Sequence, residues 1–123
     1  MKRASTVAVV VALAAAVAGG ALARPAATPV LKGSVGPGYT ISLTMNGKKV
    51  KTLKAGRYKF VIADKASIHN FTLEQESGGS FEQDLTDISD TGKKTVEVTL
   101  GKGEWKFYCS AHESQMNGSF TVS

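Results

Sequence analysis

The chain has 123 residues, of which 42% are hydrophobic and 20% are charged. This length and composition limit it to one domain with a single hydrophobic core. Fifteen basic and ten acidic side chains give a formal net charge of +5, and the only cysteine excludes a disulfide bond within the chain.

Residues 1–23 have the organisation of an export signal. A basic start, Met1-Lys2-Arg3, precedes an apolar run from Val7 to Ala18, and Ala21-Leu22-Ala23 offers small residues for cleavage. The alternative is an uncleaved membrane anchor, but about 17 apolar residues lie near the lower limit for spanning a bilayer. We therefore predict a secretory signal peptide over 1–23 and no stable membrane insertion once it is removed.

Cleavage there leaves a domain over 24–123 that is exported to the periplasm or secreted. Loss of Lys2 and Arg3 leaves 13 basic and 10 acidic side chains, a net charge of +3. Pro25 and Pro29 exclude a helix at the start of this domain. We expect Val30–Val35 to form a first edge strand.

Period-two alternation of apolar residues dominates the rest of the chain, and no stretch keeps helical periodicity over three turns. Asn46-Gly47 is the dipeptide typical of a two-residue hairpin turn. Many short strands separated by glycine-rich turns predict an all-β fold, an antiparallel sandwich or barrel. The alternating positions are Tyr39, Ile41, Leu43 and Met45; Tyr58, Phe60 and Ile62; His69, Phe71 and Leu73; Val96, Val98 and Leu100; Trp105 and Phe107; and Phe120 and Val122.

A weak internal repeat supports a sandwich. The segments 53–60 and 100–107 both read Leu, two residues, Gly, one residue, an aromatic residue, Lys and Phe. We interpret them as two equivalent corners, each a strand end, a glycine turn and a strand start.

The region 77–93 is acidic and rich in glycine. Within it, Leu85–Ile88 is interpreted as a short strand, with one helical turn as the alternative. The acidic residues lack the spacing and central glycine of a known calcium loop, so they indicate a solvated face.

A short C-terminal loop gathers the residues with the most distinctive chemistry: Cys109, His112 and Met116. In an oxidising compartment, a lone cysteine forms an intermolecular disulfide, is buried as an inert thiol, or binds a metal. Thiolate, imidazole and thioether together are a ligand set for a soft or borderline metal.

Strand parity places the second histidine near this loop. His69 shares parity with Phe71 and Leu73, and Cys109 shares parity with Trp105 and Phe107. Side chains alternate faces along a strand, so both point toward the core. The end of one antiparallel strand lies beside the starts of its neighbours, so these side chains converge at one pole.

Each ligand has an ordinary explanation by itself. His69 can be a hydrogen-bonded core histidine, Cys109 a small hydrophobe, His112 a loop histidine and Met116 a plug in the core. Together they predict a metal site. Zinc competes for two histidines and a cysteine, but a methionine in fourth place favours copper.

Two segments resemble the plastocyanin/azurin family. Phe107–His112 followed by Met116–Val122 is similar to the C-terminal copper loop of these cupredoxins, and Ser67–Phe71 is similar to their first histidine strand. The resemblance implies a cupredoxin-like Greek-key β-sandwich with one copper ion that alternates between Cu(I) and Cu(II).

The same resemblance implies specific roles at these positions. His69 and His112 would supply imidazole ligands, Cys109 the thiolate, and Met116 the long axial ligand. Three residues separate His112 from Met116, where amicyanin-like loops have two and plastocyanin-like loops have four. Beyond the ligands, we expect Asn70 to tie its loop to the backbone around Ser110. A solvent-exposed Asn70 is the alternative.

These features predict a blue copper protein that carries single electrons between redox partners, with His112 as the surface port. We predict no enzymatic activity, because both histidines are committed to the metal. The alternative function is a copper-binding or copper-delivery protein. A module that has lost its metal is disfavoured because all four ligands are present.

The sequence says little about partners. The run of basic residues from Lys48 to Lys59 is either a solvated edge or a surface that steers an acidic redox partner. We expect a monomer that does not bind nucleic acid.

Overall fold

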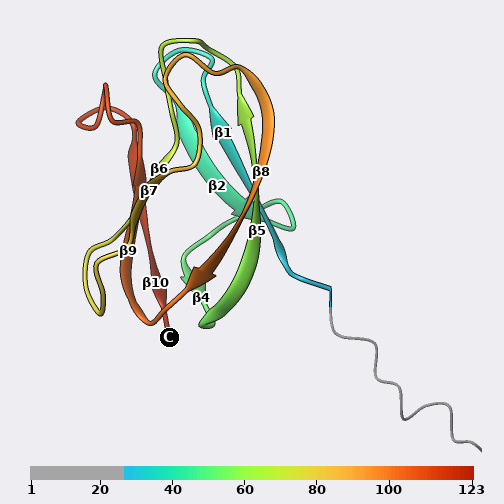
Figure 1. Cartoon of the computed structure of the whole chain (residues 1–123), viewed down its shortest axis with the longest axis vertical. Coiled ribbons are helices and arrows are strands. Elements are labelled where there is room, and N and C mark those ends of the chain that lie inside the picture. The colour runs from blue at the N-terminus through green and yellow to red at the C-terminus, as the bar shows by residue number, and fades with distance from the viewer. Residues whose placement is uncertain (1–26) are drawn as a thin grey trace, which may run out of the picture.

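Ten β-strands form two five-stranded sheets that face each other (Figure 1). The computed structural model describes residues 27–123, so the predicted signal peptide over 1–23 lies outside the described residues. Within 27–123 the secondary structure is strand and turn only. No helix of this part is long and apolar enough to cross a membrane. The all-β prediction is confirmed.

The strand order fixes which segments are neighbours. The first sheet, in spatial order, consists of β3 (Lys48–Lys49), β2 (Ile41–Met45), β1 (Val30–Val35), β5 (Gly56–Asp64) and β8 (Gly92–Leu100). The second sheet consists of β4 (Thr52–Leu53), β10 (Asn117–Val122), β9 (Gly103–Tyr108), β6 (Thr72–Gln75) and β7 (Glu82–Asp84).

The first strand is central, and the prediction of an edge strand at Val30–Val35 is wrong. β1 pairs antiparallel with β2 and parallel with β5, so both of its edges are used. Between β2 and β5 the chain crosses to the second sheet through β4 and returns in the direction of β1. A second parallel pair joins β4 and β10. Both sheets are therefore mixed rather than purely antiparallel.

The predicted hairpin turn is present. Asn46 and Gly47 have φ values of 51° and 78°, and Met45 pairs with Lys48 across the turn. Positive φ at both central residues is what a type I′ turn requires.

The acidic region departs from its prediction. The strand lies at β7, Glu82–Asp84, and residues 85–88 form a bend and a turn. Leu85 is nevertheless buried, because its N–H donates to the carbonyl of Phe71 (2.7 Å) while its side chain enters the core. A buried residue at a bend looks like a strand residue in the sequence.

The repeated motif forms two equivalent corners, as predicted. Gly56 and Gly103 have φ values of 155° and 141°, a region open to glycine. After each glycine, an aromatic side chain donates a hydrogen bond to the carbonyl four residues earlier. Tyr58 Oη donates to Lys54 (2.8 Å), and Trp105 Nε1 donates to Gly101 (2.9 Å).

Aromatic rings fill the space between the sheets beneath the C-terminal loop. The rings of Phe71 and Phe107 are stacked with centroids 5.6 Å apart. Gly118 pairs with Phe107 across the β9–β10 ladder, and the Phe107 ring lies over its Cα. A β-carbon at position 118 would overlap that ring.

We predict that Gly118→Ala destabilises the protein by about 1–3 kcal/mol, because Phe107 cannot move without displacing the ring stacked on it. Denaturant unfolding of the metal-free protein measures this loss. Ser119→Ala, an exposed position on the same strand, is the matched control and should change stability little. Equal stabilities for the two variants would contradict the packing argument.

One core carboxyl group is poorly satisfied. Asp64 is 3% exposed, and its Oδ1 accepts a hydrogen bond from the Ala66 N–H (3.2 Å). The Thr86 hydroxyl lies near this carboxyl, but among residues 27–123 no donor meets hydrogen-bond geometry at its buried Oδ2. Burial raises the pKa of Asp64 above its ordinary value of 3.8, against the opposing effects of hydrogen bonds from Ala66 and Thr86.

A raised folded-state pKa makes the ionised carboxylate a cost to folding. The cost is absent below pH 3.8 and grows as the pH rises through the folded-state pKa. We therefore predict that Asp64→Asn gains stability relative to wild type as the pH rises from about 4 to 7. Unfolding of the metal-free proteins at several pH values tests this, with the exposed Asp87→Asn as control. A difference independent of pH would contradict it.

Candidate metal centre

The loops at one end of the sandwich bring two histidines and the cysteine together. Cys109 directly follows β9, and His69 lies three residues before β6. β6 and β9 are antiparallel neighbours with Thr72 opposite Tyr108, so the end of β9 lies beside the start of β6. The metal-binding atoms of His69, Cys109 and His112 all lie within 4.8 Å of one another. The predicted convergence is therefore present for these three residues.

The three donor atoms surround a space of atomic size. His69 Nδ1 lies 3.1 Å from His112 Nδ1, and Cys109 Sγ lies 3.8 Å and 3.7 Å from these two nitrogens. The point equidistant from three atoms with these separations is about 2.1 Å from each. Metal bonds to imidazole nitrogen and thiolate sulfur measure roughly 2.0–2.3 Å. A single ion fits between them in a trigonal arrangement.

The orientation of His69 is set by the loop between β1 and β2. Its Nε2 lies 2.7 Å from the carbonyl oxygen of Gly38, which only accepts hydrogen bonds, so Nε2 carries the proton. Nδ1 is then left with a free lone pair that points at the other two donors. The side chain is 1% exposed, which prevents the ring from turning away.

The loop 109–116 closes on itself through backbone hydrogen bonds. His112 N–H donates to the Cys109 carbonyl (3.1 Å), and Met116 N–H donates to the His112 carbonyl (2.9 Å). Cys109 N–H donates to the Met116 carbonyl (3.0 Å). Met116 is 1% exposed and lies at the base of this loop, directly before β10. Its role as the axial ligand stays a prediction.

Asn70 joins the two histidine-bearing segments. Its Oδ1 accepts hydrogen bonds from the Ser110 N–H (2.8 Å) and the Ser110 hydroxyl (3.2 Å). Asn70 is 1% exposed, so the solvent-exposed alternative does not apply. The residue next to one histidine thus binds the residue next to the cysteine.

This contact continues into a chain of hydrogen bonds that the sequence analysis missed. Asn70 Nδ2 donates to Thr72 Oγ1 (3.3 Å), and Thr72 Oγ1 donates to Asp84 Oδ1 (2.6 Å). Thr72 lies on the same face as Asn70. The spacing of two residues between these polar side chains is the feature of the sequence from which their contact could have been predicted. Asp84 gave no local signal, because it reaches Thr72 through the pairing of β6 with β7.

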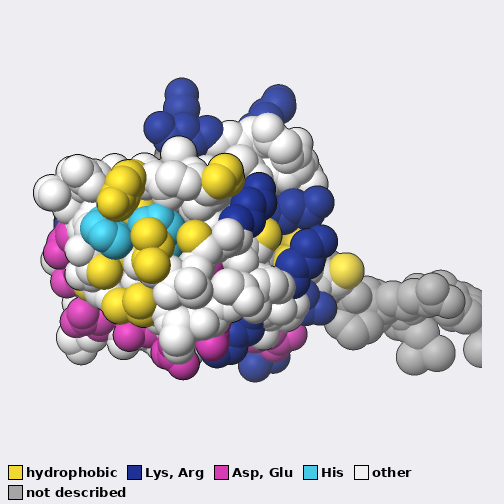
Figure 2. All heavy atoms as spheres, turned by 90° about the horizontal axis from the view of Figure 1, so that it is seen from above, with side chains coloured by type: hydrophobic (Ala, Val, Ile, Leu, Met, Phe, Trp, Pro, Cys, Tyr) yellow, Lys and Arg dark blue, Asp and Glu magenta, His cyan; other side chains and the backbone are white. Residues whose placement is uncertain are grey.

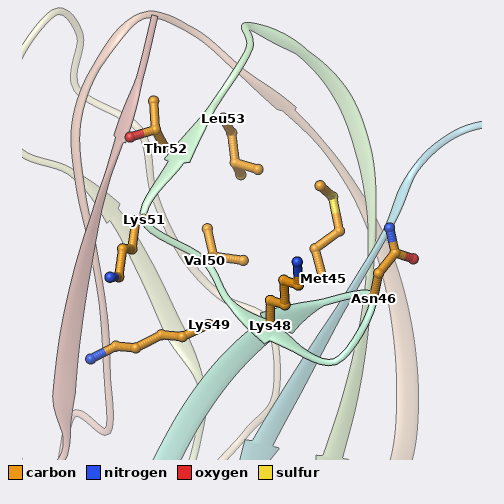
Figure 3. A pocket seen from close by; sticks show the side chains of 8 residues that line it. All are labelled: Met45, Asn46, Lys48, Lys49, Val50, Lys51, Thr52 and Leu53. Carbon is orange, nitrogen blue, oxygen red and sulfur yellow. The ribbon is translucent and has the colours of Figure 1, made fainter.

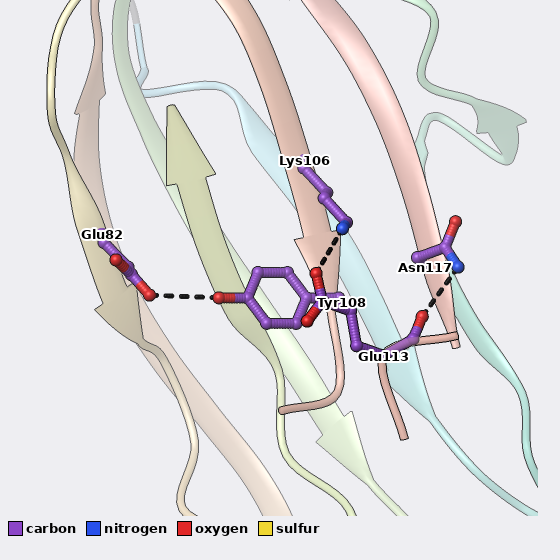
Figure 4. A network of polar contacts seen from close by, with 5 residues as sticks. All are labelled: Glu82, Lys106, Tyr108, Glu113 and Asn117. Carbon is purple, nitrogen blue, oxygen red and sulfur yellow. Dashed lines mark hydrogen bonds and ion pairs between the residues drawn. The ribbon is translucent and has the colours of Figure 1, made fainter. Parts of the chain in front are cut away.

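Polar contacts on the outer side of the second sheet hold the loop from another direction (Figure 4). Glu113 pairs with Lys106, and its carbonyl accepts a hydrogen bond from Asn117 Nδ2 (2.8 Å). Tyr108 Oη donates to Glu82 (3.1 Å). Burial, reinforced by this hydrogen bond, raises the pKa of Tyr108 well above its ordinary value, so the phenol stays a donor.

Tyr39 is an unpredicted neighbour of both histidines. Its ring meets His69 and His112 edge to face, with centroid distances of 5.5 Å and 4.9 Å. The prediction that Tyr39 alternates inward with Ile41 is wrong, because β2 begins at Ile41. Tyr39 lies in the loop after Gly38, and its side chain is 55% exposed. Gly38 has a φ of +66°.

The end of the sandwich above the metal centre is apolar. Figure 2 looks onto this end and shows histidine side chains surrounded by hydrophobic ones. Tyr39 and Ile68 are exposed large hydrophobic residues, while His112 is half-buried. Phe71 and Phe107 are buried in the same core cluster as Cys109, so this side of the centre is closed to solvent. The centre is therefore shielded except where the His112 segment meets the surface.

Comparison with known proteins identifies the family. Residues 40–123, more than half of the chain, match the family described as copper binding proteins, plastocyanin/azurin family. No curated protein matches. Among solved structures, reduced rusticyanin is 17% identical (78% of this chain, 79% of that one; TM-score 0.54). An amicyanin variant in its Cu(I) form is 11% identical (77% and 83%; TM-score 0.51). These likenesses confirm the cupredoxin fold, and with the family match and the His-Cys-His centre they show that the chain belongs to the plastocyanin/azurin family of copper-binding proteins.

Proposed function

We propose that this protein is an exported carrier of single electrons that holds one type 1 copper ion. The triangle formed by His69 Nδ1, Cys109 Sγ and His112 Nδ1 carries this proposal, because its size suits one ion in a trigonal His₂Cys set. Met116 would supply the weak axial thioether. Export rests on the organisation of residues 1–23.

When bound, copper supplies a one-electron couple between Cu(I) and Cu(II). The protein's part is to hold its donors in one arrangement that suits both oxidation states. The Gly38 carbonyl fixes His69, and Asn70 fixes the backbone beside Cys109. Little rearrangement then accompanies each electron, which favours rapid transfer.

His112 is the proposed electron port. It is half-buried, whereas His69 and Cys109 are 1% and 0% exposed, so its ring is the donor nearest to solvent. The exposed apolar residues Tyr39 and Ile68 at the same end favour close approach of a partner without charged groups in between. An electron would leave or enter through this ring.

The proposal includes no enzymatic activity. Both histidine side chains face the centre, so neither is free to act as a general base elsewhere. The buried Cys109 would bind the metal, and its burial keeps a substrate from reaching it.

The function is tested by loading the protein with Cu(II) and recording its visible and electron paramagnetic resonance spectra. We expect an intense thiolate-to-copper band, narrow copper hyperfine splitting and a reversible redox couple. Cys109→Ser should abolish the band, whereas Ser114→Ala in the same loop should retain it. A colourless protein that holds only Cu(I) would contradict the carrier and indicate copper delivery. An unchanged spectrum in Cys109→Ser would contradict the site.

A separate prediction concerns the contact between Asn70 and Ser110. We expect Asn70→Ala to weaken copper binding by about 10–100-fold, because the loop carrying Cys109 loses its link to the His69 segment. Competition with a chelator of known affinity measures this. Thr72→Val should have a smaller effect in the same direction, and Thr99→Val, exposed on β8, should have none. Equal affinity in Asn70→Ala would show that the loop holds its own shape.

A further inference from the structure

We propose that the outer face of the first sheet, beside the metal centre, is a docking surface for an acidic region of a redox partner protein. The inference rests on the proposed carrier function and adds the chemistry and position of the partner. Three observations support it: the distribution of charge over the two sheets, a hollow on one of them, and the place of two of its lysines at the metal-binding ends of their strands.

Charge is segregated between the sheets. The strands of the first sheet contain seven basic and two acidic residues, and one of the two acids is the buried Asp64. The strands of the second sheet contain one basic and four acidic residues. Viewed onto the histidine end, most Lys and Arg side chains lie at the top and right, most Asp and Glu side chains lie at the left and lower edge, and the two kinds meet along the lower edge (Figure 2).

A hollow of about 270 Å³ lies on the outer face of the first sheet. Its floor consists of short side chains from three adjacent strands: Ser34 of β1, Ser42 and Thr44 of β2, and Val61 and Ala63 of β5. Its rim carries Lys32, Lys65 and Lys93, all exposed. We call these residues the lysine-rimmed hollow.

Within the described part of the chain, the lysines of the hollow form no ion pair. No acidic residue among residues 27–123 lines the hollow. The ion pair on this sheet, between Arg57 and Glu97, lies outside the hollow. The ammonium groups therefore remain available, and hydroxyl groups of the floor can donate to an incoming carboxylate.

The hollow extends along the sheet from Thr44, near the hairpin, to Lys65 and Lys93 at the metal-binding end. Lys65 directly follows β5, and its N–H donates to the carbonyl of Val35 at the end of β1 (2.9 Å). Lys93 pairs with Ala63 near the same end. The segments that continue from β1 and β5 are those that carry Gly38 and His69. A partner seated in the hollow can thus also cover the histidine end.

The basic run from Lys48 to Lys59 begins farther from the metal centre than Lys65 and Lys93 of the lysine-rimmed hollow. β2 runs away from the metal centre and ends at the Asn46-Gly47 turn. Strand β3, which consists of Lys48 and Lys49, therefore starts at the opposite end of the sandwich. Figure 3 shows the pocket there, with Lys48, Lys49 and Lys51 around it. A partner bound at this pocket would be far from His112.

An acidic protein fits the observations better than a membrane. Long-range attraction between the lysines and carboxylates speeds encounter and orients the two molecules. The apolar area around His112 then makes the close contact. A flat anionic bilayer lying on the sheet face would leave the histidine end pointing along its surface, away from any electron donor or acceptor in it.

Two charge-reversal variants with the same net charge distinguish the effect of where the lysines lie from the effect of the protein's total charge. One carries Lys32→Glu, Lys65→Glu and Lys93→Glu, and the control carries Lys48→Glu, Lys51→Glu and Lys54→Glu. The first measurement titrates isotope-labelled, metal-free protein with a short poly-L-glutamate peptide and follows backbone amide shifts. We expect the amides around the lysine-rimmed hollow to shift, and this response to vanish only in the first variant.

The second measurement follows oxidation of the reduced copper protein by hexacyanoferrate(III) and by the cationic tris(phenanthroline)cobalt(III). At low salt, the first variant should react several-fold more slowly with the anion than the control does, and faster with the cation. The difference should disappear near 1 M salt, where screening acts over about 3 Å.

Equal rates for the two variants, or amide shifts confined to Lys48–Lys54, would overturn the proposal. Sedimentation of wild-type protein, but not the first variant, with phosphatidylglycerol vesicles and without peptide binding would overturn it in favour of a membrane. The peptide titration needs no copper, so its outcome is independent of the carrier function. Loss of colour and redox activity with peptide binding intact would remove the carrier function alone.

Discussion

The structure depends on holding two imidazole nitrogens and one sulfur close together at one end of the sandwich. His69 Nδ1 and His112 Nδ1 lie 3.1 Å apart, so their lone pairs repel unless a proton or a cation lies between them. Cys109 Sγ completes the triangle with no exposure to solvent. A bound cation would relieve this repulsion, and the hydrogen bonds made by Gly38 and Asn70 hold the segments that carry the donors beside one another.

Several parts of the fold share this task, because the loop 109–116 cannot perform it alone. The loop positions Cys109 and His112 through its own backbone hydrogen bonds. His69 arrives from another segment, and its ring is oriented by Gly38 from a third. The chain from Ser110 through Asn70 and Thr72 to Asp84 extends the support to the edge of the second sheet. Hydrogen bonds from segments of both sheets therefore support the centre.

The sequence predicted those features that depend on local periodicity. Parity placed His69 and Cys109 on the core side because each lies within two residues of buried aromatic positions. It failed for Tyr39, because the left-handed conformation of Gly38 breaks the alternation before β2 begins. It also could not show that β1 is central, since strand pairing depends on where the chain returns after crossing between the sheets. Asp84 was missed for the same reason, because only pairing of β7 with β6 brings it to Thr72.

The same distinction governs the surface charge. The basic run from Lys48 to Lys59 is continuous in the sequence, yet the fold distributes it over an edge strand, a crossing between the sheets and β5. Lys32, Lys65 and Lys93 are far apart in the sequence but share one hollow, because β1 lies beside β5 and β5 lies beside β8. Electrostatic attraction acts through space, so a cluster formed by topology can steer a partner even though no run of basic residues in the sequence reveals it. The unpredicted central position of β1 is thus also what brings Lys32 into one hollow with Lys65 and Lys93.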